Sequence, residues 1–268
     1  MDQPTMFEPF EVTTDVHVLP AYFPVPHFGL VPVNAFVLKT DEPVLVDTGL
    51  VYHTDEFIDK LATIVDLRDL RWLWLSHCDP DHIGSLQRVL AEAPNLRVIT
   101  SFIGTGRMSL SQPPPMDRIH WLNPGQSIHV GDRSLLAVRP PTYDSPETTG
   151  FYDASSEVFF SADSFGAVLN EPIMNAADID FEALSEGLVR WTKLDSPWLH
   201  LVDGHAFQAT LNGIRDLSPR LILSSHLPPA RDMTEALLEC LATVPAGEPF
   251  VSPDQQALEA MLGEMAGH

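Results

Sequence analysis

A dense group of potential metal ligands follows the hydrophobic run 72–75. Its donors are His77, Asp79, Asp81 and His82, which fall within six residues. A turn directly after a buried strand lets such side chains converge, whereas a regular strand or helix would spread them around its axis. A helix N-cap would account for one Asp. Two imidazoles and two carboxylates at this spacing therefore predict a metal site.

This motif resembles the His-x-(His/Glu/Asp)-x-Asp-His signature of proteins with the metallo-β-lactamase fold. The upstream residues Val46-Asp47-Thr48-Gly49 resemble the strand and turn that support the signature in that family. The resemblance extends from about residue 10 to 230. It implies an α/β fold, a four-layer αββα sandwich, with two metal ions at one edge of the sheets.

The resemblance also implies three ligands that come later in the chain. Asp163 follows the apolar run 158–160 and matches an Asp that bridges both metals in the family. His226 follows the predicted strand 221–223 and matches the family's last His, although His205 fits the spacing of shorter hydrolases. Asp144 lies in a loop where the family usually has a His, so the sequence departs from the common pattern there.

These assignments give each metal ion its own ligand set. One ion would be bound by His77, Asp79 and Asp144, the other by Asp81, His82 and His226, and Asp163 would bridge them. Zinc is usually held by His and Cys with fewer carboxylates, whereas hard oxygen ligands suit iron or manganese. Four carboxylates and three imidazoles therefore favour two iron ions per chain, with zinc or manganese as the alternatives.

The first motif has an acid at position 79, and in this respect the sequence resembles the flavodiiron branch of the family. That resemblance implies a dinuclear, diiron protein that binds or activates dioxygen. Flavodiiron reductases carry a flavodoxin domain, which is not expected here, so electrons would come from a separate donor. The alternative is a metal-dependent hydrolase that uses metal-bound hydroxide to attack an ester, lactone, thioester or phosphoester substrate.

Two further residues are candidates for catalysis. Tyr143 adjoins the proposed ligand Asp144 and could donate a proton or a hydrogen bond at the metals. His27 lies in a proline-rich loop before a predicted strand, from which it could line the mouth of the pocket. Packing is the alternative for Tyr143, and a surface position is the alternative for His27.

The composition limits the kinds of partner. The 268 residues include 37 acidic and 15 basic ones, a formal net charge of −22. Such a surface repels phosphate backbones and anionic lipids, so neither nucleic acid nor a membrane is an expected partner. The first residues lack a secretory signal pattern, and no apolar run reaches the ~18 residues of a membrane span. A cytoplasmic location is the resulting expectation.

Short β-prone runs alternate with segments of helical periodicity. Strands are predicted at 16–19, 35–38, 44–46, 72–75, 97–100, 119–122, 134–138, 158–160 and, as the last strand, 221–223; helices are predicted at 54–64 with Thr54 as N-cap, 85–92, within 178–193 and 206–216, and at 233–242 and 254–265. We expect residues 1–232 to form the metal-binding domain and residues 233–268 to form its helical extension. The apolar residues of that extension either pack on the domain or form a homodimer surface.

Overall fold

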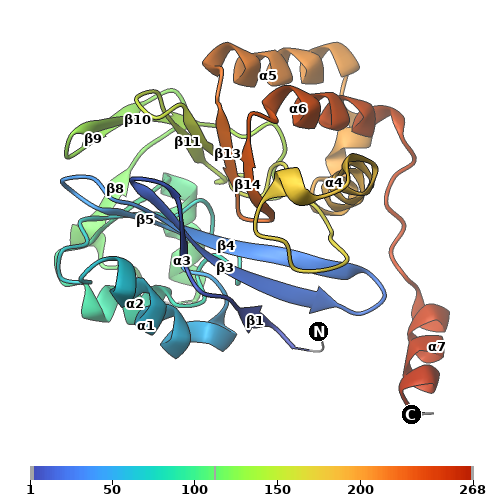
Figure 1. Cartoon of the computed structure of the whole chain (residues 1–268), viewed down its shortest axis with the longest axis horizontal. Coiled ribbons are helices and arrows are strands. Elements are labelled where there is room, and N and C mark those ends of the chain that lie inside the picture. The colour runs from blue at the N-terminus through green and yellow to red at the C-terminus, as the bar shows by residue number, and fades with distance from the viewer. Residues whose placement is uncertain (1–2, 112, 267–268) are drawn as a thin grey trace.

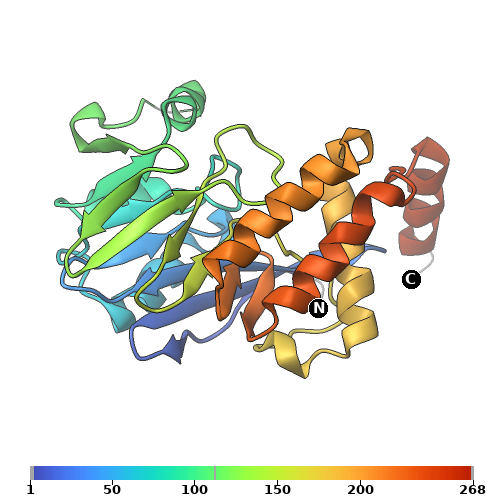
Figure 2. The same ribbon diagram turned by 90° about the horizontal axis from the view of Figure 1, so that it is seen from above.

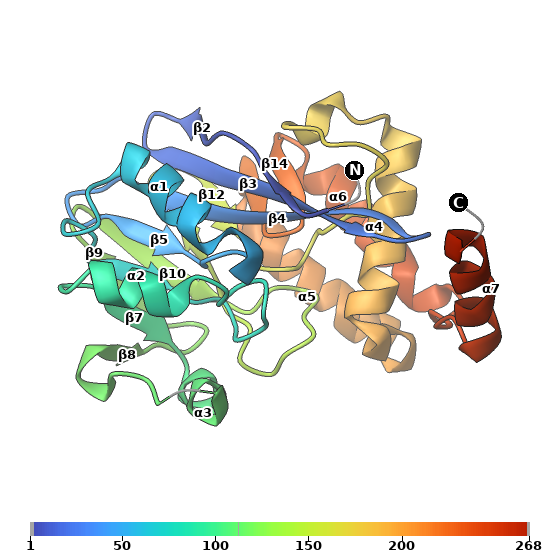
Figure 3. The same ribbon diagram turned by 90° about the horizontal axis from the view of Figure 1, so that it is seen from below.

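The computed structural model describes residues 3–111 and 113–266. Within these residues two β-sheets pack face to face, and helices cover the outer face of each sheet (Figure 1). The view from above shows the helices on one side (Figure 2), and the view from below shows those on the other (Figure 3). This is the predicted four-layer αββα arrangement. None of the helices in the described ranges is long and apolar enough to cross a membrane.

The first sheet is formed by the N-terminal half of the chain. Its strands are β1 (Thr5–Met6), β2 (Phe10–Thr13), β3 (Val16–Val25), β4 (Gly29–Leu38), β5 (Val44–Val46), β6 (Trp72–Trp74), β7 (Arg97–Thr100) and β8 (Ile119–Trp121), in the order β1-β3-β4-β5-β6-β7-β8 with β2 paired to β3. The strands from β5 to β8 are parallel. Parallel neighbours need crossover connections, which here contain α1 (Thr54–Ile64), α2 (Leu86–Glu92) and α3 (Phe102–Ser111).

The second sheet is formed by the C-terminal half. Its strands are β9 (Ser127–Val130), β10 (Arg133–Val138), β11 (Gly150–Asp153), β12 (Val158–Phe160), β13 (Leu221–Ser224) and β14 (Leu227–Arg231), in the order β14-β13-β12-β11-β10-β9. The helices α4 (Phe181–Asp195), α5 (Gly204–Leu217) and α6 (Thr234–Thr243) lie on this side of the molecule, and α7 (Gln255–Ala266) stands apart at the end of an extended segment (Figure 1).

Three apolar clusters hold the four layers together. Between the sheets, Trp74, Phe151 and Phe160 are buried, and the rings of Phe151 and Phe160 stack at 4.3 Å. A second cluster joins the first sheet to α1 and α2, and a third joins the second sheet to α4, α5 and α6. Burial of such side chains contributes roughly 1.5–3 kcal/mol each. The layers therefore form a rigid frame for the loops at the strand ends.

Three details of the predicted elements were wrong. Thr54 is the first helical residue of α1, and the N-cap position belongs to His53. The strand containing Leu221 is not the last one, because β14 follows it. Pro228 and Pro229 made β14 hard to predict, yet β14 is an edge strand, where a missing N–H group is tolerated. The structure also contains α3 and the strands β1, β2, β9 and β11, which the sequence pattern did not indicate.

The C-terminal extension behaves in two ways. In α6, Leu237, Leu238 and Leu241 are fully buried against the second sheet and its helices. In α7, Leu258 and Leu262 are about half exposed. Packing on the domain thus accounts for α6, while a dimer surface on α7 stays a prediction.

Candidate metal centre

The predicted ligands converge at one edge of the sandwich. His77, Asp79, Asp81 and His82 follow the carboxyl end of β6 in the first sheet, as the sequence suggested. The second sheet supplies Asp144 from the β10–β11 loop, Asp163 after β12, and His226 from the turn between β13 and β14. Because β12 and β13 are parallel, their carboxyl ends lie side by side. The centre is therefore built from both sheets.

The Asp163 carboxylate lies between two groups of side chains. Its Oδ2 is 3.3 Å from His77 Nε2, whereas its Oδ1 is 3.1 Å from His82 Nε2 and 3.2 Å from His226 Nε2. Each oxygen thus faces different imidazoles. This is the arrangement that a carboxylate bridging two ions requires.

Donor atoms of the remaining groups have similar separations. His77 Nε2 is 3.7 Å from Asp144 Oδ1, and Asp79 completes a group of three donors within 4.8 Å of one another. On the other side, Asp81 Oδ2 is 3.6 Å from His82 Nε2 and 3.5 Å from His226 Nε2. Ligands bound to one ion at ~2.1 Å lie roughly 3.0–3.4 Å apart in octahedral or tetrahedral geometry. Small side-chain shifts would bring both groups to that spacing.

Several donor atoms in the cluster are buried without a hydrogen-bond partner. Within the described residues these include His77 Nε2, His82 Nε2 and Asp163 Oδ1. Buried polar atoms normally have partners, so each unpaired one needs an explanation. All three point at the cluster, where a cation would be their partner. The donor set therefore fits a metal site.

The other ring nitrogens of the three histidines are held by the protein. His82 Nδ1 donates to Asp47 Oδ2 at 2.8 Å, and His226 Nδ1 donates to the Pro32 carbonyl at 2.7 Å. His77 Nδ1 lies 3.1 Å from Ser76 Oγ, which itself donates to Asp47. Such contacts fix the tautomer and leave Nε2 with its lone pair for a metal. The Asp47-Thr48-Gly49 turn thus supports the site directly.

Electrostatics in the cluster favour positive charge. Burial lowers the pKa of His82 and His226, but the nearby carboxylates Asp81 and Asp163 reverse this effect. The pKa of His226 rises to about 9, and that of His82 lies well above its ordinary value. Burial raises the pKa of Asp144 to about 6, and the nearby carboxylates Asp163 and Asp79 add to this, although His77 opposes it. Divalent cations would supply the positive charge that protons otherwise provide.

Two non-glycine residues with left-handed backbone conformations adjoin the centre. Asp47 has φ 57°, and Ala162, directly before Asp163, has φ 51°. Such conformations cost of order 1 kcal/mol or more and persist where the surrounding contacts hold them. Here the Ala162 carbonyl accepts hydrogen bonds from Ser224 Oγ and Ser225 N at 3.0 and 2.9 Å. These bonds join the Asp163 turn to the His226 turn.

The other candidates lie in different settings. His205 is exposed at the start of α5, so the geometry favours His226 as the last ligand. His27 is exposed in the turn before β4, whose first residue, Gly29, lies roughly 10 Å along the strand from Pro32 at ~3.3 Å per residue. The structure does not bring His27 to the cluster. The ring of Tyr143 packs against Trp198 at 5.0 Å and beneath the Arg139 guanidinium, which supports a packing role.

Three residues at the centre were missed in the sequence. Asp195, at the end of α4, has an oxygen within 4.8 Å of Asp144 and Asp163 oxygens, and burial with these charges raises its pKa to about 8. Arg107 on α3 donates from Nη2 to Asp79 Oδ1 at 3.1 Å. Trp191 donates to the Asp163 carbonyl at 3.2 Å and packs on the His226 ring. Of the three, only Asp195 had a signal in the sequence: an acid at the C-terminus of a helix is unfavourable, because it faces the negative end of the helix dipole.

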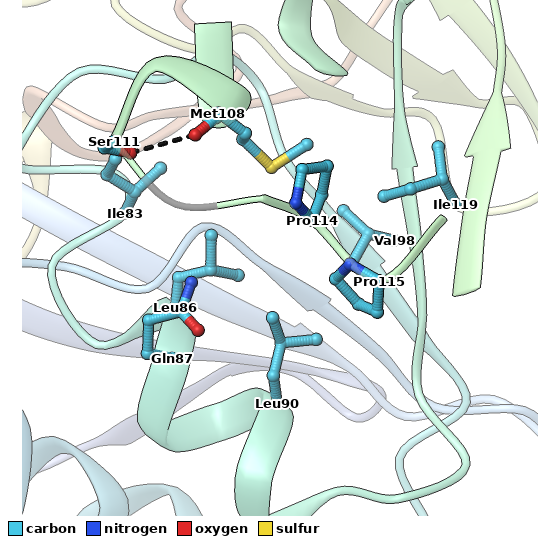
Figure 4. Close-up of a pocket in the computed structure, with 10 residues that line it drawn as sticks. All are labelled: Ile83, Leu86, Gln87, Leu90, Val98, Met108, Ser111, Pro114, Pro115 and Ile119. Carbon is cyan, nitrogen blue, oxygen red and sulfur yellow. Dashed lines mark hydrogen bonds between the residues drawn. The ribbon is translucent and has the colours of Figure 1, made fainter. Parts of the chain in front are cut away.

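A separate hollow of about 260 Å³ lies between α2, α3 and β8 (Figure 4). Figure 4 shows Leu86 and Leu90 on one side of it, with Met108 and Pro114 next to each other on the opposite side. The lining residues that the structure describes include no carboxylate, imidazole or thiol. The chemistry is therefore assigned to the His/Asp cluster and not to this hollow.

Comparison with known proteins identifies the family. A family model described as ODP family beta lactamase matches residues 31–226. The chain belongs to this family. Among curated relatives, an uncharacterized protein of Methanocaldococcus jannaschii is 27% identical over 202 residues, 72% of this chain and 48% of that protein. The anaerobic nitric oxide reductase flavorubredoxin of Pectobacterium atrosepticum is 23% identical over 171 residues, 63% of this chain and 34% of that protein.

Solved structures share the fold of this chain. Rubredoxin oxygen:oxidoreductase from Desulfovibrio gigas superposes with a TM-score of 0.79 at 17% identity, covering 91% of this chain and 63% of that one. A mutant flavo di-iron protein from Thermotoga maritima superposes with a TM-score of 0.76 at 21% identity, covering 92% of this chain and 64% of that one. The predicted metallo-β-lactamase fold is thereby confirmed. The chain spans half or less of the length of the curated relatives named above.

Proposed function

We propose that this chain is a dinuclear, diiron metalloprotein that binds or activates dioxygen. The observation that carries the proposal is the Asp163 carboxylate, whose two oxygens face two separate groups of imidazoles and carboxylates. The donor set contains more carboxylate oxygens than is usual for zinc and suits iron. The names of the relatives, flavo di-iron protein and rubredoxin oxygen:oxidoreductase, support the same chemistry.

In this proposal each part of the chain has a definite task. His77, Asp79 and Asp144 hold one ion, Asp81, His82 and His226 hold the other, and Asp163 binds both. Iron held there would supply the electrons and open coordination positions for dioxygen chemistry. The oxidised iron would then need an electron donor, which we propose to be a separate protein. Residues 1–232 would form the metal-binding domain, with 233–268 as its helical extension.

Metal content is the first test. We expect two iron ions per wild-type chain, and one or none in Asp163→Ala, because that residue is the shared ligand. The exposed Asp59→Ala on α1 removes the same charge elsewhere and should keep two. The measurement is elemental analysis combined with a visible absorption spectrum. Two tightly bound ions in Asp163→Ala would exclude the bridging role.

Reactivity is the second test. The dithionite-reduced protein should be reoxidised rapidly by oxygenated buffer, as followed by stopped-flow absorption. Carboxylates in place of imidazoles make the site more anionic, which weakens its action as a Lewis acid towards carbonyl substrates. Turnover of generic esters or β-lactams by the metal-loaded protein should therefore be slow. An iron-free protein with fast zinc- or manganese-dependent hydrolysis would overturn the proposal in favour of a hydrolase.

A further inference from the structure

Asp195 lies beside the centre but has no place in the ligand sets described above. One oxygen each of Asp144, Asp163 and Asp195 lie within 4.8 Å of one another. The side chain of Asp195 reaches this position from the last residue of α4. Three carboxylates so close together repel one another unless positive charge is present.

The preceding turn of α4 fixes the direction of Asp195. Trp191 is four residues earlier, and residues at this spacing share one face of a helix. Its indole Nε1 donates to the Asp163 carbonyl at 3.2 Å, and its ring lies 4.4 Å from the His226 ring. These contacts press this face of α4 against the centre. The position of Asp195 is therefore built into the packing of α4.

Two further observations indicate a cation near Asp195. The His77 side chain is fully buried, and its Nε2, 3.7 Å from Asp144 Oδ1, has no hydrogen-bond partner in the described part of the chain. In addition, the C-terminus of a helix carries partial negative charge, which disfavours an acid there. Ser196 Oγ donates to Asp195 Oδ2 at 3.0 Å, which orients the carboxylate and leaves Oδ1 available.

We propose that Asp195 is a fifth carboxylate of the metal centre, which strengthens binding of the ion held by His77, Asp79 and Asp144. This rests on the dinuclear centre proposed above. Asp195 acts through its charge and its free oxygen, on the side of that ion where Asp144 lies. The chemical class it selects is a divalent cation that prefers oxygen ligands, such as Fe²⁺ or Mn²⁺.

The test is a titration of the metal-free full chain with Mn²⁺. Binding is monitored by calorimetry and by electron paramagnetic resonance. Wild type should bind two ions. Asp195→Asn, which preserves shape, should keep one site and weaken the other by about 10–100-fold. Glu186→Gln removes one charge from an exposed position on the same helix and should match wild type.

Thermal unfolding separates this role from a structural one. Without metal, Asp195→Asn should unfold at the wild-type temperature or higher, because a partly buried acid crowded by two other acids is replaced by a neutral amide. With saturating Mn²⁺, the unfolding temperature of the variant should rise by less than that of wild type. The inference would be overturned if Asp195→Asn bound Mn²⁺ at both sites as tightly as wild type does. It would also be overturned if the variant lost the same stability with and without metal. A wild type that binds no metal would instead overturn the dinuclear centre itself.

Discussion

At the scale of single residues, the Asp79 carboxylate has two kinds of partner. Its Oδ1 accepts from Arg107 Nη2 at 3.1 Å, which leaves Oδ2 for a metal. Arg107 is held in turn by Glu147, whose side chain is fully buried, through an ion pair of 3.1 Å, and by Ser145 Oγ at 2.7 Å. Arg107 therefore positions a proposed ligand through a network that reaches into the second sheet.

Arg107→Gln should weaken both the site and the fold. Asp79 would lose its orientation, and Glu147 would be left buried without its counter-charge. We expect metal affinity to fall about 10–100-fold and the free energy of unfolding to fall by about 2 kcal/mol, a figure reduced for the partial exposure of Arg107. Metal titration and urea denaturation measure the two effects. Arg88→Gln, from an exposed ion pair on α2, should change neither; equal effects would contradict the positioning role.

Some site residues could be predicted from the sequence and others could not. The first four ligands are local, since they occupy one turn between 77 and 82. Asp144, Asp163 and His226 depended on resemblance to a family, because only the tertiary fold brings them together. Asp195 was missed because the predicted helix stopped at residue 193, two positions short. Arg107 was missed because its helix, α3, was not predicted.

At the scale of elements, the turn after β5 and the turn after the metal motif are in close contact. Thr48 N donates to the His82 carbonyl at 2.7 Å, and Gly84 N donates to the Gly49 carbonyl at 2.9 Å. A Cβ on Gly84 would lie 2.2 Å from Val51 N and 2.3 Å from Gly49 O, both backbone atoms. Only glycine permits this approach, which sets where His82 lies.

Gly84→Ala should therefore separate the two turns. We expect a loss of about 2–4 kcal/mol in the free energy of unfolding, from overpacking against backbone, together with reduced metal occupancy. The control is Gly106→Ala in α3, where an added Cβ meets no atom within 4 Å. That change should raise the free energy of unfolding by about 0.5–1 kcal/mol, because alanine has a higher helix propensity than glycine. Urea denaturation checks both variants, and an unaffected Gly84→Ala would show that the turns can move apart.

The elements that were hard to predict share a physical reason. The helix α3 contains Gly104 and Gly106, which lower helix propensity, yet packing of Met108 and Thr105 compensates for this. The strand β14 contains two prolines that only an edge position tolerates. Its turn holds His226, so the last proposed ligand lies within a hairpin and not after the last strand. Tertiary context decided these cases, and local sequence does not contain it.

At the scale of the whole molecule, an ion cluster joins the two sheets at the end opposite the metal centre. Arg133 at the start of β10 donates to Asp153 Oδ2 at 2.7 Å, and also contacts Asp15 in the turn before β3. Burial raises the pKa of Asp153, but hydrogen bonds from Ser155 and Ser156 and the charge of Arg133 outweigh this, so its pKa lies below the ordinary value.

Stability should then depend on pH through Asp153. Since its folded pKa is lower than its unfolded pKa of ~3.9, its contribution is complete above that pH and is lost as pH falls through the folded pKa. Asp153→Asn should lower the free energy of unfolding by about 1.5–3 kcal/mol at pH 7 and by progressively less in strong acid. Asp132→Asn, more exposed beside the same arginine, is the control. Chemical denaturation from pH 7 to 2 checks this, and a cost independent of pH would contradict it.

The division of the ligands between two sheets also has a kinetic consequence. We expect an ion bound by His77 and Asp163 to leave mainly when the two sheets separate at this edge, because its proposed ligands come from both sheets. The rate of metal release is then limited by how often this edge of the sandwich opens. With a strong chelator in excess, the release rate should reach a plateau that no further chelator raises, and that plateau equals the opening rate of the edge.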